Sequence, residues 1–560
     1  MNKPLTGYPS IDKPWLKYYT EEQINAPLPH MTAYEYLRQQ NAGHEDLQAI
    51  DSALGNYTYR GLFSMIDRTA AALWQLGVKK GQIVLEMLPV MPHESFLFYG
   101  VDVTGAALAP LAPMYPTEEV CKAARKFDAA LFFTFDMLLT PEMEQAVYAQ
   151  TGVQHIVSIG AAQTRDPRTM TWEAFLALGE GKPMPEISRD PKDLLFLAST
   201  GGSTGEPKSV MLNDNCFNIA VHQYINSALD YQAGDRWMRL WPIFSASAAI
   251  VNFHLPLCVG MNNLLRVFPE KLESFDRMIL DDKPHHLIMI PQLLDAVEDS
   301  KLLDGQDLCH VKTAGCGGLS MTAQFEERVS VFYKKLNISC FLGHGWGCTE
   351  SSTCGTMRMN HATTRIGTVG IPHLNTTVGV FDPDTGAEMQ YGQVGELCIL
   401  SPANMMGYYH DLQTTKQVLR THHDGSVWLH NGDLGCMDKD GIVTVKGRMT
   451  RVIFVFPTAK IYPQAMESAV SKVEGVQEVV SCQVPDQKHE GFFLPVCFIV
   501  PDGKHDSAEV VRNVRAFCRE TMPEYAWPAA IHLRDRLPLT RVGKPDIRKL
   551  EAELLAGNAE

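Results

Sequence analysis

From Tyr57 onward, the apolar positions of the chain follow two alternating patterns. Residues 58–76 carry apolar side chains on one face of a helical period behind Thr58 as N-cap, whereas residues 83–88 form a short apolar run. Strands that alternate with helices favour parallel sheets covered on both faces. The sequence therefore predicts an α/β fold with a large domain of βαβ sheets.

The pattern changes at three places in the chain. The first 30 residues are rich in proline and aromatic side chains, and we expect an extended arm that packs on the body. From Gly367 the spacing is that of hairpin strands, which predicts a β-rich subdomain. After Arg448 the pattern is typical of a small α+β unit. We expect a large N-terminal domain, residues 1–448, and a small C-terminal domain, residues 449–560.

Composition narrows the class of protein. The 560 residues are 45% hydrophobic and 20% charged, as in ordinary globular proteins, and the net charge is −15. A nucleic-acid binder more often carries a basic face, so we expect no nucleic-acid partner. No apolar run reaches about 18 residues and the N-terminus lacks a signal-peptide core, so we expect no stable membrane insertion.

The 13 cysteines include no C-x-x-C pair, which argues against a disulfide framework and favours a reducing, cytoplasmic location. Cys340, Cys348 and Cys354 lie near His344 in the sequence. Their intervals do not fit a zinc finger or ribbon, so we expect buried or inert thiols.

One glycine-rich stretch, TGGSTGEPK, follows an apolar run at residues 194–198. Glycine allows close approach of the backbone, and successive N–H groups form a concave anion site. Hydroxyls and the lysine add donors and charge, which suits a polyphosphate; a surface turn is the alternative. It is not a Walker A loop, because Glu and Pro separate glycine from lysine. The residues in question are Thr200, Gly201, Gly202, Ser203, Thr204, Gly205, Glu206, Pro207 and Lys208.

Three further stretches are unusual. Residues 315–318 place three glycines and a cysteine at the end of an apolar strand, where backbone could lie flat against a planar ring. In residues 341–350 glycine alternates with large side chains before Thr349 and Glu350; a strand-to-helix turn with Thr/Glu capping is the alternative. Residues 245–249 are small, which leaves volume either for close helix packing or for a ligand.

Taken in order, from about residue 58 to 550, these motifs resemble the adenylate-forming superfamily of acyl-CoA synthetases, firefly luciferase and peptide-synthetase adenylation domains. The acyl-CoA synthetase branch is most similar. The resemblance implies an AMP-forming acid–thiol ligase that uses ATP and Mg²⁺ to convert a carboxylic acid to an acyl-adenylate, then transfers the acyl group to CoA as co-substrate.

The resemblance also assigns roles by position. Lys544 would be the catalytic lysine, with Thr349 on the α-phosphate and Glu350 holding Mg²⁺; Asp433 and Arg448 would hold the ribose. Taken alone, Lys544 reads as a surface lysine and Asp433 as a turn carboxylate. The implied ATP/AMP-binding residues are Thr200, Gly201, Gly202, Ser203, Thr204, Gly205, Lys208, Gly315, Cys316, Gly317, His344, Gly345, Trp346, Gly347, Asp433 and Arg448.

The predicted acyl pocket departs from the family pattern, since Ser245 stands where a histidine is usual. Residues 241–252 contain no acid that could pair with an α-amine, which disfavours amino acids and favours a fatty or aryl acid. The pocket residues predicted here are Phe244, Ser245, Ala246 and Ala249.

Three other departures concern the loops. Gly201 replaces the usual serine of the phosphate loop, and Arg451 stands at the hinge between the domains. Pro457 and Thr458 replace a glycine that usually helps shape the pantetheine tunnel, and both restrict the backbone. The acceptor is therefore predicted to be CoA or a carrier-protein phosphopantetheine. A catalytically impaired acyl-adenylate-binding relative is the further alternative.

Overall fold

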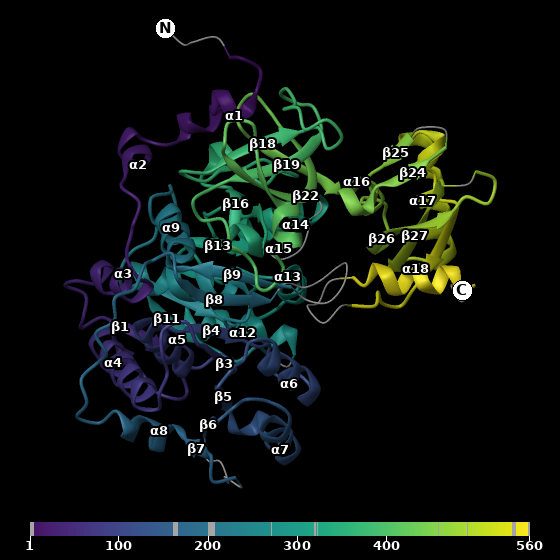
Figure 1. Ribbon diagram of the computed structural model, residues 1–560. Helices are drawn as coiled ribbons and strands as arrows, with labels where there is room; N and C mark the ends of the chain where they lie inside the picture. The colour runs from purple at the N-terminus through teal and green to yellow at the C-terminus, as the bar shows by residue number, and fades with distance from the viewer. Residues whose placement is uncertain are drawn as a thin grey trace.

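The computed structural model confirms the predicted class, with a large mixed α/β N-terminal domain and a small C-terminal domain beside it (Figure 1). It describes residues 5–160, 166–199, 208–269, 271–317, 321, 323–456, 459–489, 491–539 and 545–557. The phosphate-loop residues 200–207, the pair Pro457 and Thr458, and Lys544 lie outside the described residues. The exact boundary after Arg448 stays a prediction.

Two large sheets form the body of the N-terminal domain. Eight described strands make one sheet, in which β3, β4, β5, β6, β7 and β8 are parallel and β9 and β20 are antiparallel to their neighbours. Its order is β20 (Gly407–Tyr408), β9 (Ser209–Asn213), β8 (Leu194–Ser199), β4 (Ala107–Pro110), β3 (Ile83–Met87), β5 (Leu131–Phe135), β6 (His155–Ile159) and β7 (Thr169–Thr171).

The second sheet has seven described strands, all parallel except at the β1–β2 pair. Its order is β14 (Leu342–Gly343), β13 (Thr313–Cys316), β12 (His286–Met289), β10 (Arg236–Arg239), β11 (Asn262–Leu265), β1 (Gln48–Asp51) and β2 (Tyr57–Thr58). The strand β14 thus forms the edge nearest the candidate site.

Helices and sheets alternate in five layers. The shared core between the two sheets contains the buried faces of α3 (Ala33–Gln40), α4 (Tyr59–Gln75), α5 (Pro92–Thr104) and α9 (Asp214–Ile225). The outer face of the first sheet is covered by α6 (Thr117–Lys126) and α7 (Pro141–Gln150). The outer face of the second is covered by α12 (Phe275–Asp282), α13 (Pro291–Glu298) and α14 (Ala323–Lys335). Thr58 caps α4 by accepting the N–H of Gly61, as predicted.

The β-rich subdomain follows. Its main sheet pairs β18 (Thr377–Phe381), β19 (Gly395–Leu400), β22 (Val427–Met437), β21 (Leu419–Thr421) and β23 (Val443–Arg448), with α15 (Leu412–Val418) beside it. A smaller sheet joins β15 (Gly345–Gly347), β16 (Cys354–Met357) and β17 (Ile371–Pro372). The two share one hydrophobic cluster, which includes Trp346.

The N-terminal arm packs on this subdomain but is not extended. It folds into the short helices α1 (Pro9–Asp12), η1 (Pro14–Tyr18) and α2 (Glu21–Asn25). Proline opens the first two, and Thr20 and Gln23 form a capping box for the third. Trp15 is buried, and the Tyr19 hydroxyl donates to the Pro372 carbonyl at 2.9 Å. The prolines therefore start helices here rather than preventing them.

After Arg448 the chain forms η7 (Met449–Arg451) and the hairpin of β24 (Ile453–Val455) and β25 (Ala459–Ile461). A three-stranded sheet of β26 (Val476–Pro485), β27 (Phe493–Pro501) and β28 (Ala530–Leu533) follows. Its helices are α16 (Pro463–Val470), α17 (Ser507–Thr521) and α18 (Ile547–Leu555). The segment after Arg448 therefore has the α+β structure that the sequence predicts.

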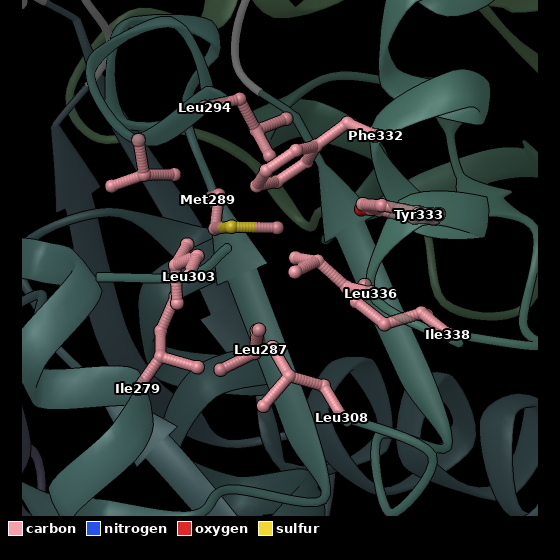
Figure 2. A pocket seen from close by; sticks show the side chains of 12 residues that line it. Ile279, Leu287, Met289, Leu294, Leu303, Leu308, Phe332, Tyr333, Leu336 and Ile338 are labelled. Atoms are coloured by element: carbon pink, nitrogen blue, oxygen red, sulfur yellow. The ribbon is translucent and has the colours of Figure 1, made fainter. Parts of the chain in front are cut away.

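An apolar cavity lies behind the second sheet, among β12, β13, α12 and α14 (Figure 2). Its free volume of about 10 Å³ is at the lower limit for one water molecule. The hydroxyl of Tyr333 has no hydrogen-bond partner among the described residues. This cavity is too small for an acyl chain. No described helix is long and apolar enough to cross a bilayer.

Candidate active site

The second sheet brings two glycines together at the carboxyl ends of parallel strands, where ligands of open α/β sheets usually bind. Gly315 on β13 pairs with Gly343 on β14, and a Cβ on Gly343 would lie 3.3 Å from the Cα of Gly315. A side chain at Gly343 would therefore make a tight contact with the neighbouring strand. The N–H of Gly317 donates to the Met289 carbonyl at 3.3 Å, which ties the predicted adenine-facing end to β12.

His344 connects the ends of β13 and β14. Its Nδ1 lies 3.1 Å from the carbonyl oxygen of Cys316 and donates to it. Burial, with a smaller effect of the Arg358 charge, lowers the pKa of His344 to about 4, so the ring is neutral at pH 7. Burial also raises the pKa of the Cys316 thiol to about 12. His344 is thus a neutral side chain whose hydrogen bond joins the ends of β13 and β14 at the predicted adenine site.

Asp433 lies at the meeting point of the two sheets of the β-rich subdomain. Its Oδ2 accepts the indole N–H of Trp346 at 2.8 Å, and its Oδ1 lies 2.8 Å from Nε of Arg448. Asn431 also donates to Oδ2, at 3.1 Å. Asp433 is 5% exposed, whereas the Arg448 side chain is 47% exposed. The carboxylate is held by buried groups on one side and by a solvent-facing cation on the other.

Glu350 lies on the 3₁₀ turn η5 (Thr349–Ser351), which follows β15. The hydroxyl of Tyr408 donates to Glu350 Oε1 at 2.7 Å. The Lys208 ammonium lies 4.9 Å from the centroid of the same Tyr408 ring, a cation–π distance. Burial and the Glu350 charge raise the pKa of Tyr408 above its usual range, so it remains a donor. Tyr408 therefore links the phosphate-loop lysine to the predicted metal-binding carboxylate.

The turn after Gly347 is not the strand-to-helix turn, capped by Thr349 and Glu350, that was the alternative prediction. Strand β16, not a helix, follows Thr349 and Glu350, and the polar cap is made by Ser351, whose hydroxyl accepts the N–H of Cys348 at 3.0 Å. Burial, with the nearby charges of Glu350 and Asp433, raises the pKa of the Cys348 thiol. The side chains of Thr349 and Glu350 are consequently left for other contacts.

The predicted acyl-pocket residues lie together at the start of α10 (Ala246–Ala249). Ser245 caps this helix by accepting the N–H of Ala248 at 3.4 Å, and Phe244 is half-buried. Ala246 and Ala249 are buried in the core between the two large sheets. The π-helical turn η3 (Ile250–His254) follows directly. A role in binding an acyl group stays a prediction.

The element before the pocket is anchored by a buried ion pair. Arg239 lies 2.6 Å from Oε2 of Glu94, and Oε1 of Glu94 accepts the N–H of Ile243 at 3.1 Å. Both charged side chains are at most 1% exposed. Sequence reasoning did not find this pair, because its partners are 145 residues apart.

The predicted hinge residue lies at the end of η7. Arg451 is 2.6 Å from Oε1 of Glu467 on α16 and donates to the Ser481 carbonyl at 3.0 Å. Both of these partners lie after Arg448 in the chain. Its hinge role stays a prediction.

Tyr408 and Asn431 also contact predicted site residues, Glu350 and Asp433, but were not predicted themselves. Tyr408 lies in the Gly-Tyr-Tyr segment on β20, which pairs with the strand directly after the phosphate loop. Asn431 precedes Asp433 by two residues. Two sequence signals could have indicated these residues. One is the aromatic residue after a glycine, and the other is the amide residue close to a candidate carboxylate.

Comparison with known proteins agrees with this arrangement. The family model of AMP-binding enzymes matches residues 37–409, and that of the AMP-binding enzyme C-terminal domain matches residues 465–544. A long-chain-fatty-acid–CoA ligase of Bacillus subtilis is 26% identical over 97% of this chain and 98% of its own. 4-Coumarate–CoA ligase 2 of Petroselinum crispum is 25% identical over 91% of each.

Solved structures share the fold. The anthranilate CoA ligase AuaEII, in complex with anthranoyl-AMP, matches with a TM-score of 0.83 and 21% identity, over 96% of this chain and 99% of its own. The amide bond synthetase McbA of Marinactinospora thermotolerans matches with a TM-score of 0.78 and 22% identity, over 93% and 99%. The predicted resemblance to adenylate-forming enzymes is confirmed, and this chain belongs to the family of AMP-binding enzymes.

Proposed function

We propose that this protein activates a carboxylic acid with ATP to give an acyl-adenylate and then transfers the acyl group to CoA. The observation that carries the proposal is the arrangement of Asp433. This buried carboxylate is oriented by Arg448 and by Trp346, which follows the strand-end glycine Gly343 by three residues. A fixed carboxylate with two oxygens suits a bidentate grip on vicinal ribose hydroxyls.

The exposed Arg448 supports this assignment. Its guanidinium lies beside Oδ1 of Asp433, yet about half of the Arg448 side chain faces solvent. A ribose hydroxyl can therefore replace this contact without leaving a buried charge unpaired. Trp346 would continue to hold the other oxygen.

Glu350 suits a Mg²⁺ ion that accompanies ATP. Carboxylate oxygens are preferred ligands of this hard cation, and Tyr408 occupies only Oε1 among the described residues. When bound, Mg²⁺ would neutralise phosphate charge. Tyr408 orients the carboxylate, and Lys208 supplies positive charge for the pyrophosphate that leaves.

The two half-reactions follow from these positions. A carboxylate oxygen of the acid attacks the α-phosphorus, and the bond to pyrophosphate breaks. Thr349 and Lys544 would stabilise the negative charge that develops on the phosphate oxygens, an effect worth about 3–4 kcal/mol per donor in other enzymes. The thiol of CoA then attacks the acyl carbonyl and releases AMP and a proton. Between the steps, the unit after Arg448 would turn about Arg451 and withdraw Lys544.

The substrate is proposed to be a fatty or aryl acid. Residues 241–252 contain no acidic side chain, and Ala246 and Ala249 are small and apolar. The relatives named above act on long-chain fatty acids and on 4-coumarate. We assign the reaction to the cytoplasm, because the described cysteines are free thiols, as suits a reducing compartment.

The test is carboxylate-dependent ATP–pyrophosphate exchange over a panel of fatty and aryl acids, followed by thioester formation with CoA or with a phosphopantetheine-loaded carrier protein. We expect exchange with at least one acid and thioester with CoA. Absence of exchange with every acid would contradict the proposal. Exchange with transfer only to the carrier protein would contradict the CoA step alone.

A further inference from the structure

The segment that carries Asp433 is a bulge in strand β22. Glu396 on β19 pairs with Leu434, and Cys398 pairs with His430, so one intervening residue on β19 faces three on β22. The extra residues leave the ladder with β19, and Gly432 adopts a positive φ of 79°. Bulges of this kind re-aim side chains at functional sites. Asp433 lies in this bulge, where it accepts the Trp346 indole N–H and stays paired with Arg448 on β23.

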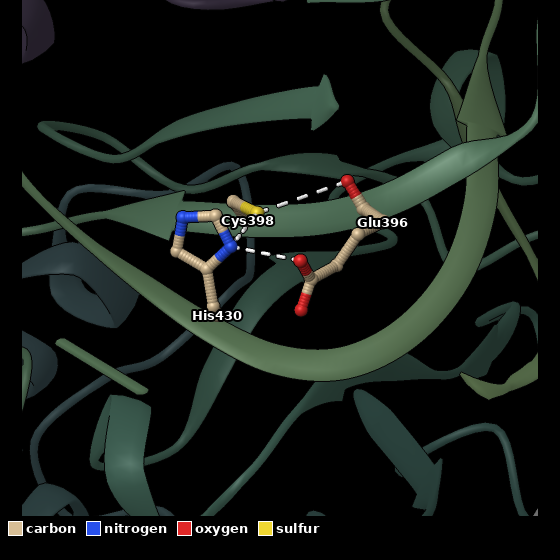
Figure 3. A group of neighbouring side chains, drawn as sticks. All are labelled: Glu396, Cys398 and His430. Atoms are coloured by element: carbon tan, nitrogen blue, oxygen red, sulfur yellow. Dashed lines mark hydrogen bonds and ion pairs between the residues drawn. The ribbon is translucent and has the colours of Figure 1, made fainter. Parts of the chain in front are cut away.

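A buried glutamate closes the bulge from the neighbouring strand. Glu396 is 3% exposed, and its Oε1 accepts the N–H of Gly432 at 3.1 Å. Its Oε2 lies 2.8 Å from Nδ1 of His430, as Figure 3 shows. Nε2 of His430 in turn lies 3.0 Å from Nε2 of His422. Both oxygens of the glutamate are therefore held, one of them by a backbone N–H that the bulge has taken out of the ladder.

Asn431 completes the bulge from within. Its side-chain oxygen accepts the N–H of Asp433 at 2.9 Å, and its amide donates to the Asp433 carboxylate at 3.1 Å. On the β19 side, the backbone around Gly432 is thus fixed by side chains, while Asp433 stays paired with Arg448 on β23. Of these side chains, Glu396 is the one that reaches across from another strand.

We propose that Glu396 is a positioning residue for the nucleotide, which holds the bulge so that Asp433 meets the ribose hydroxyls. The inference rests on the proposed role of Asp433. Without the carboxylate, the partly buried Gly432 N–H would lose its acceptor, and the bulge would relax toward another conformation. Glu396 touches no substrate and acts only through Gly432 and Asp433.

The electrostatic surroundings favour a charged Glu396. Burial alone would raise its pKa, but the hydrogen bond and charge of His430, the charge of Arg420 and the Gly432 N–H together hold the pKa below its usual value. A charged acceptor makes stronger hydrogen bonds than a neutral one. This adds to the stiffness of the bulge near pH 7.

Metal binding is an alternative role for the same side chains, and the experiment must distinguish it from the positioning role. Cys398 Sγ lies 3.2 Å from Nδ1 of His430, so Glu396, Cys398 and His430 together could offer three ligand atoms to a metal ion. Hydrogen bonds within the protein already engage the Cys398 thiol, Nδ1 of His430 and both oxygens of Glu396. These bonds favour the positioning role over a metal site, and the metal content of the protein distinguishes the two.

The test compares ATP with 3′-deoxy-ATP in the pyrophosphate-exchange assay. The Glu396→Leu variant fills the volume of the side chain but removes the acceptor. Glu396→Ala provides a second variant in case the first does not fold. Glu396→Gln keeps an acceptor oxygen. As a control, Glu388→Ala alters a glutamate of the same subdomain that accepts the backbone N–H and the hydroxyl of Ser10. Asp433→Ala serves as the reference for loss of the ribose contact.

We expect the KM for ATP to rise about tenfold in the Leu and Ala variants with kcat nearly unchanged, the fold-change of one unsatisfied hydrogen-bonding group. The preference for ATP over 3′-deoxy-ATP should fall toward one in both, and persist in Glu396→Gln and Glu388→Ala. Thermal unfolding shows which variants are folded.

Equal losses with both nucleotides in the folded Leu or Ala variant would overturn the positioning role while leaving the function intact. One equivalent of tightly bound zinc in the wild-type protein, absent from Glu396→Leu, would overturn it in favour of a metal site. A wild-type preference that persists in Asp433→Ala would instead contradict the ribose role in the proposed function, and with it this inference.

Discussion

The indole N–H of Trp346 donates a 2.8 Å hydrogen bond to the carboxylate of Asp433, which lies 87 residues further along the chain. Trp346 is on β15 of the smaller sheet, and Asp433 is on β22 of the main sheet of the β-rich subdomain. The indole is 7% exposed and packs in the cluster shared by these sheets. The core of the subdomain therefore sets the direction of a candidate ribose-binding group.

The Trp346→Phe variant should bind ATP about tenfold more weakly, because it keeps a ring but removes a buried donor to a carboxylate, a bond worth about 1.5–3 kcal/mol. The measurement is the KM for ATP in pyrophosphate exchange. Trp527→Phe loses an indole hydrogen bond to the Met522 carbonyl in the C-terminal unit and serves as control. Equal effects of the two substitutions would contradict the Trp346–Asp433 role.

Replacing Tyr408 with Phe should raise the Mg²⁺ concentration needed for half-maximal exchange, by roughly threefold to tenfold. The change removes the donor to Glu350 but keeps the ring beside Lys208. Loss of one hydrogen bond of about 1 kcal/mol accounts for this magnitude. A Mg²⁺ titration at saturating ATP provides the measurement.

The neighbouring Tyr409→Phe variant is the matched control, because Tyr409 packs against Phe127 and His410 rather than Glu350. It should leave the Mg²⁺ dependence unchanged. If Tyr408→Phe also leaves it unchanged, Tyr408 does not orient a metal-binding carboxylate.

The Lys544→Ala variant should lose adenylation almost completely while it still binds ATP. The expected loss is 10²–10³-fold in the rate of exchange, the usual effect of removing one donor to developing negative charge. Equilibrium binding of ATP checks the second half of the prediction. Pyrophosphate release at the wild-type rate would show that this lysine has no part in the chemistry.

His373 should make the fold sensitive to acid. Burial lowers the pKa of its ring to about 3, and its nitrogens have no hydrogen-bond partner among the described residues. An unfolded histidine titrates near 6.5, so between pH 6.5 and 3 the unfolded chain binds a proton that the folded chain does not. The free energy of unfolding should therefore fall as the pH falls through this window, by about 1.4 kcal/mol per unit at most.

The His373→Leu variant should remove this contribution and keep the packing against Tyr224, whose ring centroid lies 4.9 Å away. Denaturant unfolding at several pH values measures the slope. His30→Leu, at an exposed position, serves as control. The prediction fails if the slope of His373→Leu equals that of the wild-type protein.

Much of the fold was readable from local pattern, because helices and strands bury one face with a regular period. The Thr58 cap and the run at residues 83–87 became α4 and β3 as expected. The N-terminal arm was wrong in detail, since Pro9 and Pro14 start helices in which their missing N–H is no loss. Local sequence also did not tell a strand from a helix after Glu350, because the pairing of β16 with β15 and β17 decides it.

The sequence by itself determined which chemical groups this protein offers. The glycine-rich turns, Glu350 and Asp433 have the same functional groups in any fold. Tertiary structure alone decided which of them meet. Tyr408 reaches Glu350 across 58 residues, and Glu396 reaches the Gly432 N–H across 36. These contacts depend on strand pairing and on a bulge, whose register is set by burial over whole sheets rather than by neighbouring residues.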